Sequence, residues 1–569
     1  MFSKIKIKLS SILKDHGYNV EPKIFSVPPK IEMGDLALPC FELAKSQKKN
    51  PVELAKEICA KVSDKRILRA EPIGPYVNFY FKPEYYNKEV LNHQVKFAPN
   101  SGKVMIEYSQ PNTHKEFHIG HLRNAVLGSA LVNLKRFCGQ NILAVNYIGD
   151  TGVHVAKWLW WFFKKYQGVL PIEKTDVFGK IYTEATTELE KNPEFSVEVS
   201  LMHRILEKSI EKSFNNAELS DEEKNILETW QKTKSASLEY FKKIYQKLNI
   251  DFDLWFYESE EEVAGKKLIS EILNSKKIPQ IKKSEGAVIA DLREFNLDVL
   301  VLIKSDGNAL YGAKDLPLGI KKFKNLNVDE SYYIVDKRQS LYLQQIFKLF
   351  DLLGFAEKKK KHIDYDFVTL PDGAMSSRKG NIVTFADLFA EVLAKSFAET
   401  KNRHADWSEE KLKMTAEKIA LAGIKFFLLK YDNSSVIVFD IDKALAFEGD
   451  SGVYLLYVVS RINSILRKEK SSKFLLDLSV LTSLAERNLL RKIDDFAEVL
   501  QKANETDALN GLSTYLIELA QIFNNFYHEC PVLTAEKKIK KARLRLCEKV
   551  KEIMTQGLNI LNIGTLEEM

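Results

Sequence analysis

Cysteine is scarce in this sequence and shows no metal-binding spacing. Five cysteines are spread over 569 residues, and no two of them form a Cys-x-x-Cys pair. A zinc knuckle needs closely spaced thiolates and a disulfide framework needs many of them, so neither is supported. We expect reduced, mostly buried thiols and no tightly bound metal held by protein ligands.

Long apolar runs are also missing. No stretch is long enough to span a bilayer, and residues 1–18 alternate lysines with apolar side chains without the apolar core of a secretory signal. The cytoplasm is therefore the simplest expectation. Internal repeats and low-complexity segments are absent from the sequence as well.

A strong excess of one charge is lacking too. The chain has 84 Lys and Arg against 77 Asp and Glu, and the net charge of +7 permits a polyanionic partner without requiring one. Its 569 residues, 45% hydrophobic and 28% charged, are expected to form three or four globular domains with sizeable cores.

The segment Ser109-Gln-Pro-Asn-Thr-His-Lys-Glu-Phe-His-Ile-Gly-His121 has the layout of a nucleotide site. The pattern predicts a buried strand over 103–108 before it, a helix over 122–137 after it and a second strand over 141–147. This β-α-β order puts a helix N-terminus at the carboxyl end of a strand. Open sheets bind ligands there, and free backbone N–H groups favour phosphate.

Three residues of this segment are candidates for phosphate and base contacts. His118 and His121 are three apart, so both imidazoles lie on one helical face and can donate to phosphate oxygens. Gly120 lacks the Cβ that would keep a flat base away. The alternative is that the same residues merely cap a surface helix.

The chain divides by pattern into three parts. The pattern of residues 1–95 predicts a small α+β domain. In residues 405–569 the apolar side chains recur almost throughout with the spacing of helices. Between them, residues 103–402 alternate strands and helices, including strands at 286–292 and 299–303. This alternation predicts a Rossmann-like, doubly wound parallel sheet interrupted by an insertion at about 158–253.

Two helical segments have unusual composition. Trp158-Leu-Trp-Trp-Phe-Phe163 is expected to pack in a core, with base stacking as the lesser alternative. Residues 537–546 carry several cations along an apolar stripe. That run is either a solvated face or a surface that follows RNA phosphates.

A second candidate nucleotide element is the glycine-bearing loop Gly373-Ala-Met-Ser-Ser-Arg-Lys-Gly-Asn381, which follows a predicted strand at 367–370. Together with His-Ile-Gly-His, this loop resembles the paired motifs of class I aminoacyl-tRNA synthetases. The resemblance implies ATP contacts from His118, Gly120, His121, Met375, Ser376, Arg378 and Lys379. It departs from the usual Lys-Met-Ser-Lys-Ser loop, because Ala374 and Ser377 replace both lysines.

The missing lysines narrow the resemblance to arginyl-tRNA synthetases. That family commonly lacks the loop lysine and carries one just before the histidines, as this chain does at Lys115. The resemblance therefore implies that Lys115 acts with His118 and His121 as the catalytic set. The alternative is that Lys115 is an ordinary exposed lysine without a catalytic role.

The same family implies an arginine pocket. The stretch 304–315, with Ser-Asp-Gly and Tyr-x-x-x-Asp, is similar to the family's guanidinium-binding segment, in which paired hydrogen bonds to carboxylates are suited to a planar cation. On spacing alone, each residue could be a surface or capping group. The residues implied are Asn112, Glu258, Tyr311, Asp315 and Gln339.

The sequence assigns no functional role to two residues near the second predicted strand. Asp150 follows that strand, and an Asx turn is its ordinary explanation. The family usually carries Gln where this chain has His154, so the resemblance assigns no contact to that side chain.

The resemblance implies that arginine is activated with Mg-ATP and transferred to the 3′-terminal adenosine of tRNA(Arg), with activation dependent on bound tRNA. It further implies that residues 1–95 contact the outer corner of the tRNA and that residues 405–569 bind the anticodon. We expect a monomer. The alternatives are another class I synthetase, a nucleotidyltransferase of similar architecture, or a non-catalytic tRNA-binding relative.

Overall fold

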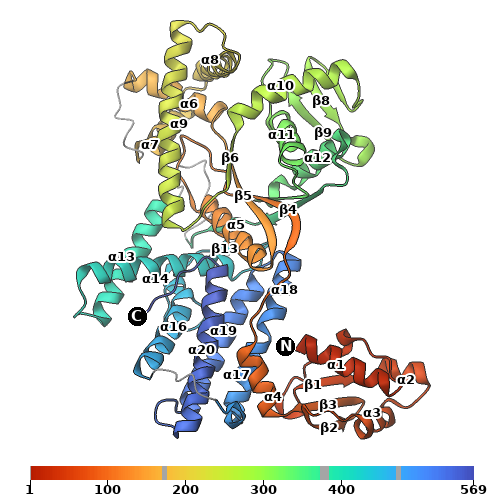
Figure 1. Cartoon of the computed structure of the whole chain (residues 1–569). Coiled ribbons are helices and arrows are strands. Elements are labelled where there is room, and N and C mark those ends of the chain that lie inside the picture. Colours follow the sequence, from red (N-terminus) through yellow and green to blue (C-terminus); the bar gives the residue numbers. More distant parts are fainter. Residues whose placement is uncertain (1, 169–175, 372–382, 470–475) are drawn as a thin grey trace.

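The computed structural model describes residues 2–168, 176–371, 383–469 and 476–569. In Figure 1 a parallel sheet lies at the centre of the molecule. Two subdomains rise above the sheet, a bundle of long helices lies below it, and the N-terminal domain extends to one side of that bundle.

The N-terminal domain is a three-stranded antiparallel sheet covered by helices. Strand order is β1-β3-β2, and Leu36 pairs with Phe79 in the register of β1 and β3. Its elements are α1 (Phe2–Asp15), β1 (Leu36–Pro39), α2 (Phe41–Gln47), α3 (Pro51–Lys61), β2 (Ile67–Ile73), β3 (Tyr76–Phe81) and α4 (Pro83–Asn92).

The central sheet is wholly parallel, in the order β11-β10-β4-β5-β6. The predicted Rossmann-like fold class is thereby confirmed. The elements of this part are β4 (Asn100–Glu107), α5 (Ile119–Phe137), β5 (Gln140–Ile148), β6 (Leu254–Tyr257), α10 (Glu258–Ser275), α11 (Tyr311–Ile320), β10 (Glu330–Asp336), α12 (Ser340–Phe350) and β11 (Lys359–Tyr365).

The connection from β5 to β6 is the predicted insertion, and it is helical. Its helices are α6 (Val153–Tyr166), α7 (Asp176–Lys191), α8 (Ser196–Phe214) and α9 (Asp221–Lys247). Trp158 and Phe162 of the aromatic run are buried in the core of this insertion, so the expectation of core packing is confirmed.

The strands expected at 286–292 and 299–303 are present but do not join the parallel sheet. They form β8 (Ala287–Asp291) and β9 (Val299–Ile303), which pair antiparallel with each other and with β7 (Ile281–Ser284). Short connections between these strands close hairpins, whereas a parallel pair would need a longer crossover.

The C-terminal part is a helical bundle. A two-stranded parallel pair, β12 (Val368–Thr369) and β13 (Ile437–Val438), links it to the central domain. Its helices are α13 (Phe385–Arg403), α14 (Glu409–Leu429), α15 (Ile441–Ala444), α16 (Gly452–Lys468), α17 (Leu484–Asp494), α18 (Phe496–Thr506), α19 (Asn510–Glu529) and α20 (Lys537–Ile560).

Helix α5 joins the sheet to this bundle. It contacts β4 and β5 on one side and α14, α18 and α20 on the other. Most of its side chains are therefore buried, including Lys135, which forms an ion pair with Asp507 after α18. A helix buried on all sides is fixed in position, so its N-terminus is held rigidly at the edge of the sheet.

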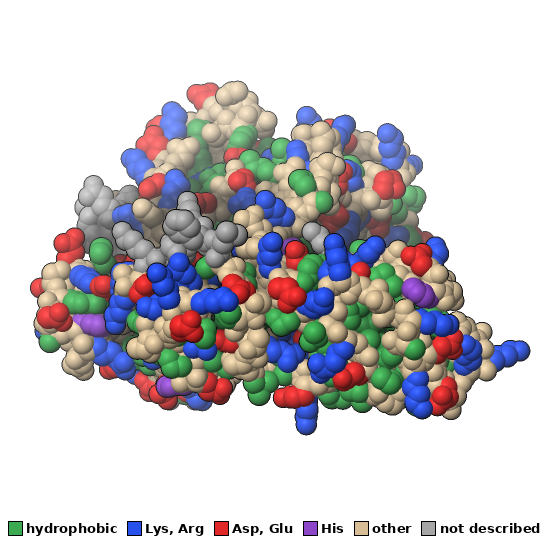
Figure 2. Space-filling model, turned by 60° about the horizontal axis from the view of Figure 1, so that its bottom comes forward, with side chains coloured by type: hydrophobic (Ala, Val, Ile, Leu, Met, Phe, Trp, Pro, Cys, Tyr) green, Lys and Arg blue, Asp and Glu red, His purple; other side chains and the backbone are tan. Residues whose placement is uncertain are grey.

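Several cations at the start of α20 have partners within the chain. Arg543 pairs with Glu486 at 2.7 Å, Lys538 with Asp477 at 2.8 Å, and Arg545 donates to the carbonyl of Leu91 at 2.7 Å. Figure 2 shows basic and acidic side chains interspersed over the lower face of the molecule. These contacts give the run a structural role between the bundle and the N-terminal domain.

No helix in the ranges given above is long and apolar enough to cross a membrane.

Candidate functional site

The two predicted histidines form the N-terminal cap of α5. Nδ1 of His118 accepts the backbone N–H groups of Gly120 at 3.1 Å and His121 at 3.3 Å, while Nδ1 of His121 accepts the N–H of His118 at 3.4 Å. The rings stack with centroids 3.7 Å apart. The capping role is thus real, and because each Nδ1 is an acceptor, the neutral rings carry their protons on Nε2.

Both imidazoles are neutral at physiological pH. Burial, together with the nearby charge of Lys115, lowers the pKa of His118 to about 4. Burial, His118 and Lys115 likewise hold the pKa of His121 well below its ordinary value. The site therefore offers two neutral Nε2–H donors at a helix N-terminus, where an anion is favoured.

Gly120 is needed for the cap itself. A Cβ at this position would lie 2.9 Å from Cε1 and 3.0 Å from Nδ1 of His118. Any side chain would therefore press against the capping ring, a constraint that is separate from the expected approach of a flat base.

The turn before α5 is anchored by His114, which sequence reasoning missed. Its φ is +64°, and its buried ring contacts Thr113 Oγ1 at 2.9 Å and Thr233 Oγ1 at 2.8 Å. The ring also lies edge-on to Trp158, with centroids 5.0 Å apart. The nucleotide turn is thus fixed to α6 and α9 of the insertion, a contact that no local spacing reveals.

The chain on the C-terminal side of the second predicted motif lies beside the histidine cap. Phe385 N–H donates to the carbonyl of Phe117 at 2.7 Å, and Ile119 N–H donates to Val383 at 3.3 Å. The chain therefore returns beside His118 directly after residues 372–382. The predicted ATP contacts Met375, Ser376, Arg378 and Lys379, and the substituted positions Ala374 and Ser377, lie outside the described residues.

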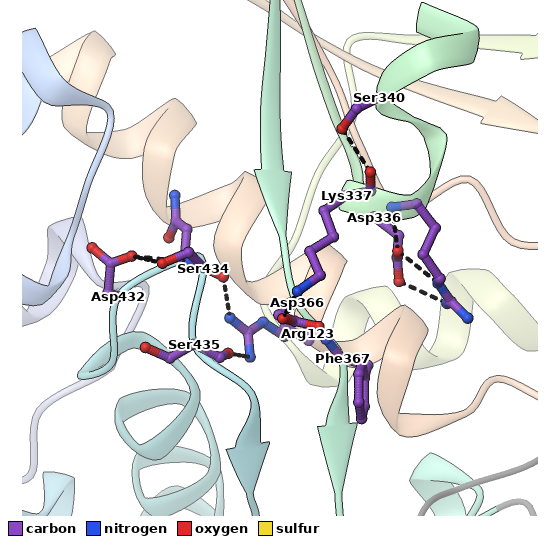
Figure 3. Close-up of polar contacts among 11 residues, drawn as sticks. Arg123, Asp336, Lys337, Ser340, Asp366, Phe367, Asp432, Ser434 and Ser435 are labelled. Carbon is purple, nitrogen blue, oxygen red and sulfur yellow. Dashed lines mark hydrogen bonds and ion pairs between the residues drawn. The ribbon is translucent and has the colours of Figure 1, made fainter.

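Polar contacts fix the edge of the sheet next to this region (Figure 3). Arg123 of α5 donates to the carbonyls of Asn433 at 2.9 Å and Ser435 at 3.2 Å, and Lys337 forms an ion pair with Asp366. Arg123 thereby ties the turn before β13 to the helix whose N-terminus carries the histidines, and the Lys337–Asp366 pair joins the ends of β10 and β11.

The five predicted arginine contacts line one cavity of about 320 Å³. The cavity lies at the carboxyl edge of the parallel sheet, which is where such sheets bind ligands. Its remaining lining includes Glu107, Gln110, Tyr147 and Tyr342. Carboxylates among aromatic rings are suited to a flat cation, since they supply both charge and planar walls.

Asp315 is a half-buried carboxyl of this cavity. Tyr342 donates to its Oδ2 at 2.5 Å, a partner 27 residues away that sequence reasoning missed. Burial raises the pKa of Asp315 to about 7, against the opposing effect of the Tyr342 hydrogen bond. Near neutral pH both protonation states of this carboxyl are therefore accessible.

Glu258 has a buried cationic partner. Lys314 Nζ lies 3.3 Å from Glu258 and 3.0 Å from Glu262. Burial opposes the charge on Lys314, but the two carboxylates outweigh it and raise its pKa. Burial also raises the pKa of Glu258, and Lys314 counteracts that shift.

Asp150 makes long-range contacts instead of an Asx turn. Its buried carboxylate accepts the N–H of Ser259 at 2.8 Å and its hydroxyl at 2.6 Å, and it pairs with Lys234 at 2.5 Å. These bonds fix the start of α10, and with it Glu258. His154 lines a second cavity, on the insertion side.

Lys115 lies in that second cavity. Its Nζ is 5.0 Å from the centroid of the Tyr182 ring in α7. Burial lowers the pKa of Lys115, while Glu258 counteracts the shift. The lysine is close enough to affect both histidines electrostatically, as their lowered pKa values reflect.

Within the ranges that the structure describes, no group of three or more His, Cys, Asp or Glu residues could hold a metal ion.

Three family profiles match the chain in succession. Residues 3–81 match the arginyl tRNA synthetase N-terminal domain, residues 87–441 the catalytic domain of class I (R) tRNA synthetases, and residues 455–569 the DALR anticodon binding domain. Nearly the whole chain is covered, in the order that the sequence predicted.

Curated relatives and solved structures agree with these profiles. Arginine–tRNA ligase of Bdellovibrio bacteriovorus is 35% identical over 557 residues, covering 95% of this chain and 93% of its own. That of Halothermothrix orenii is 33% identical, covering 96% and 95%. The structure of Thermus thermophilus arginyl-tRNA synthetase superposes with a TM-score of 0.78 at 26% identity over 100% of both chains. A Plasmodium falciparum arginyl-tRNA synthetase shares the fold, with a TM-score of 0.75 at 21% identity over 99% of each chain.

The cap geometry predicts how His118 titrates. Because its Nδ1 accepts two backbone N–H groups, the ring should remain neutral and protonated on Nε2 from pH ~8 down to pH ~5.5, whereas an ordinary histidine gains its proton near pH ~6.5. Imidazole ¹⁵N shifts, assigned by comparison with His118→Gln, measure this. A midpoint near the ordinary value, or a proton on Nδ1, would contradict the geometry.

Proposed function

This chain belongs to the arginyl-tRNA synthetase family of class I aminoacyl-tRNA synthetases, and from that membership we propose that it ligates L-arginine to tRNA(Arg), consuming ATP and releasing AMP. The observation that carries the proposal is the cavity in which Asn112, Glu258, Tyr311, Asp315 and Gln339 come together.

The pocket receives arginine by charge and shape. Asp315 and Glu258 accept hydrogen bonds from the guanidinium group, and Tyr311 lies at the mouth, where it borders both cavities. Asn112 and Gln339 hold the α-amino group. Asn112 is well placed for this because its turn also leads into the histidine cap, so the amino acid's carboxylate is directed towards the nucleotide.

Adenylate formation then needs positioning and charge stabilisation. The arginine carboxylate attacks the α-phosphate of ATP, and pyrophosphate leaves. The Nε2–H groups of His118 and His121 donate to the phosphate oxygens as charge develops on them, and Lys115 adds a cation from the same turn. Gly120 leaves the base room to approach the cap.

Further ATP contacts come from the loop that follows β12. We assign these contacts to Met375, Ser376, Arg378 and Lys379, as the family resemblance implies. Mg²⁺ enters with ATP as part of the substrate complex and neutralises phosphate charge, so no dedicated protein site for it is needed.

The second step transfers arginine to the 3′-terminal adenosine of tRNA. We assign residues 1–95 to contacts with the outer part of the tRNA, residues 103–402 with the insertion at about 158–253 to catalysis, and residues 405–569 to the anticodon. The enzyme acts as a cytoplasmic monomer, and arginine activation depends on bound tRNA.

A charging assay tests the function directly. Total tRNA, ATP and each amino acid in turn should give acylated tRNA with arginine alone, because only a cationic guanidinium satisfies the pocket's carboxylates. Exchange of labelled pyrophosphate into ATP should require both arginine and tRNA. Charging with a different amino acid would refute the assignment, and tRNA-independent exchange would refute the coupling.

Arginine affinity should depend on pH through Asp315. Below pH ~7 its carboxyl is protonated in the empty pocket and must release that proton to accept the guanidinium, so the Kd should rise as pH falls, by up to about tenfold per pH unit. Equilibrium dialysis of labelled arginine at pH values on both sides of 7 measures this. The Kd rises as pH falls because the pKa of the Asp315 carboxyl is raised, whereas the guanidinium group of arginine stays cationic throughout this pH range.

Two variants check the origin of that pH dependence. Asp315→Asn should weaken binding by roughly 30-fold or more and abolish the dependence, since a charged hydrogen-bond partner is lost. Tyr342→Phe removes the donor that lowers the pKa of Asp315, so the transition should move to higher pH. A wild-type Kd that is flat across this range would contradict the role of Asp315.

A further inference from the structure

The arginine cavity contains a buried hydroxyl without a partner. Tyr147 lies near the end of β5 and lines the cavity together with Asp315 and Glu258. Its hydroxyl oxygen is buried and has no hydrogen-bond partner among the described residues. Burying an unpaired hydroxyl costs free energy, so a group of this kind in the wall of a ligand cavity indicates a contact with the ligand.

The hydroxyl of Tyr147 is under the influence of both carboxyl groups that are assigned to the guanidinium. Burial raises the pKa of Tyr147 well above its ordinary value, and the charges of Asp315 and then Glu258 add to that shift. Burial and the same two carboxyl groups also raise the pKa of Tyr342, which donates to Asp315. Tyr147 therefore belongs to the acidic end of the cavity.

The two carboxylates cannot accept every donor of a guanidinium group. Arginine brings five N–H donors in one plane, and a carboxylate in bidentate pairing accepts two of them. Asp315 already accepts the hydroxyl of Tyr342, and Glu258 lies 3.3 Å from the ammonium of Lys314. At least one N–H is left over, and Tyr147 offers an acceptor beside the two carboxylates.

Two other tyrosines of the cavity are less suited to this role. Tyr311 is exposed at the mouth, where water can reach its hydroxyl. Tyr333 lies beside a buried cation, because the Lys322 ammonium is 4.3 Å from its ring centroid and pairs with Glu107 at 2.7 Å. That cation repels a guanidinium group, so Tyr147 is better placed than either of them.

We propose that the Tyr147 hydroxyl accepts a hydrogen bond from the guanidinium group and thereby helps the pocket to select arginine over lysine. This inference rests on the proposed function, and it adds a residue that the family resemblance did not supply. A lysine ammonium has three N–H donors, which Asp315 and Glu258 can accept between them, so lysine gains nothing from the hydroxyl. Arginine loses a charge-assisted hydrogen bond when the hydroxyl is removed.

The test compares two ligands on three proteins. Wild type, Tyr147→Phe and a control, Tyr257→Phe, are titrated with labelled arginine at pH ~8, where Asp315 is largely ionised, and lysine is measured as a competitor. Tyr257 ends the neighbouring strand β6 and is not among the residues that line the cavity. Equal thermal unfolding midpoints establish that both variants are folded.

Tyr147→Phe should raise the Kd of arginine about tenfold, the lower end of the effect of a hydrogen bond to a charged group. Its Kd for lysine should stay close to that of wild type, so the preference for arginine should fall by the same factor. A merely structural role of Tyr147 would not change this preference. Tyr257→Phe should leave both Kd values unchanged.

Three outcomes would overturn the proposal. An unchanged Kd of arginine in Tyr147→Phe would show that the hydroxyl makes no contact with the ligand. Equal weakening of arginine and lysine would make the hydroxyl a structural group of the cavity, and an equal loss in Tyr257→Phe would assign the effect to the pair of strands. A wild type that binds lysine as tightly as arginine, or neither of them, refutes the proposed function instead.

Discussion

The geometry of the site depends on one buried cation, Lys314. Helices α10 and α11 approach so closely that a Cβ on Gly265 would lie 2.0 Å from the carbonyl oxygen of Ala313. This approach puts Lys314 within 3.3 Å of Glu258 and 3.0 Å of Glu262. Without that cation, two buried carboxylates would face each other, and burial would favour their protonation. Lys314 thus keeps Glu258 available as an acceptor for a cationic ligand.

The same ion pairs extend into the insertion. Lys266 lies 3.4 Å from Glu262 and 3.8 Å from Glu207 of α8, and Glu207 lies 3.1 Å from His203. Burial and the facing carboxylate of Glu262 raise the pKa of Glu207. A continuous set of buried ionisable side chains therefore links the wall of the second cavity to the first cavity. His114 makes a parallel link, since it fixes the nucleotide turn to α6 and α9. Arginine, ATP and the tRNA end would all meet around elements that the insertion holds in place.

The sequence predicted the parts of the site that motifs and helical spacing encode. His118 and His121 are neighbours through one helical turn, and Tyr311 and Asp315 share a face of α11, so their proximity follows from local geometry. The contacts of Tyr342 and Lys314 are different. Tyr342 reaches Asp315 from another helix, and Lys314 meets Glu258 from 56 positions away, so only tertiary packing brings them together. The separate antiparallel sheet was missed for a related reason. The pattern of residues 286–292 and 299–303 predicts that both segments are strands, but which strands they pair with depends on connection length and packing.

A double-mutant cycle on arginine binding tests most directly whether Lys314 acts through Glu258. Lys314→Gln should raise the Kd of arginine by about tenfold at neutral pH, which corresponds to a rise of about one unit in the pKa of Glu258. This loss of affinity should become smaller as pH rises, because Glu258 is then deprotonated again. In a Glu258→Gln background the same change should have little effect, and Lys314→Arg should preserve binding in a folded protein. An equal loss in both backgrounds, or tighter binding when Lys314 is replaced, would contradict this account.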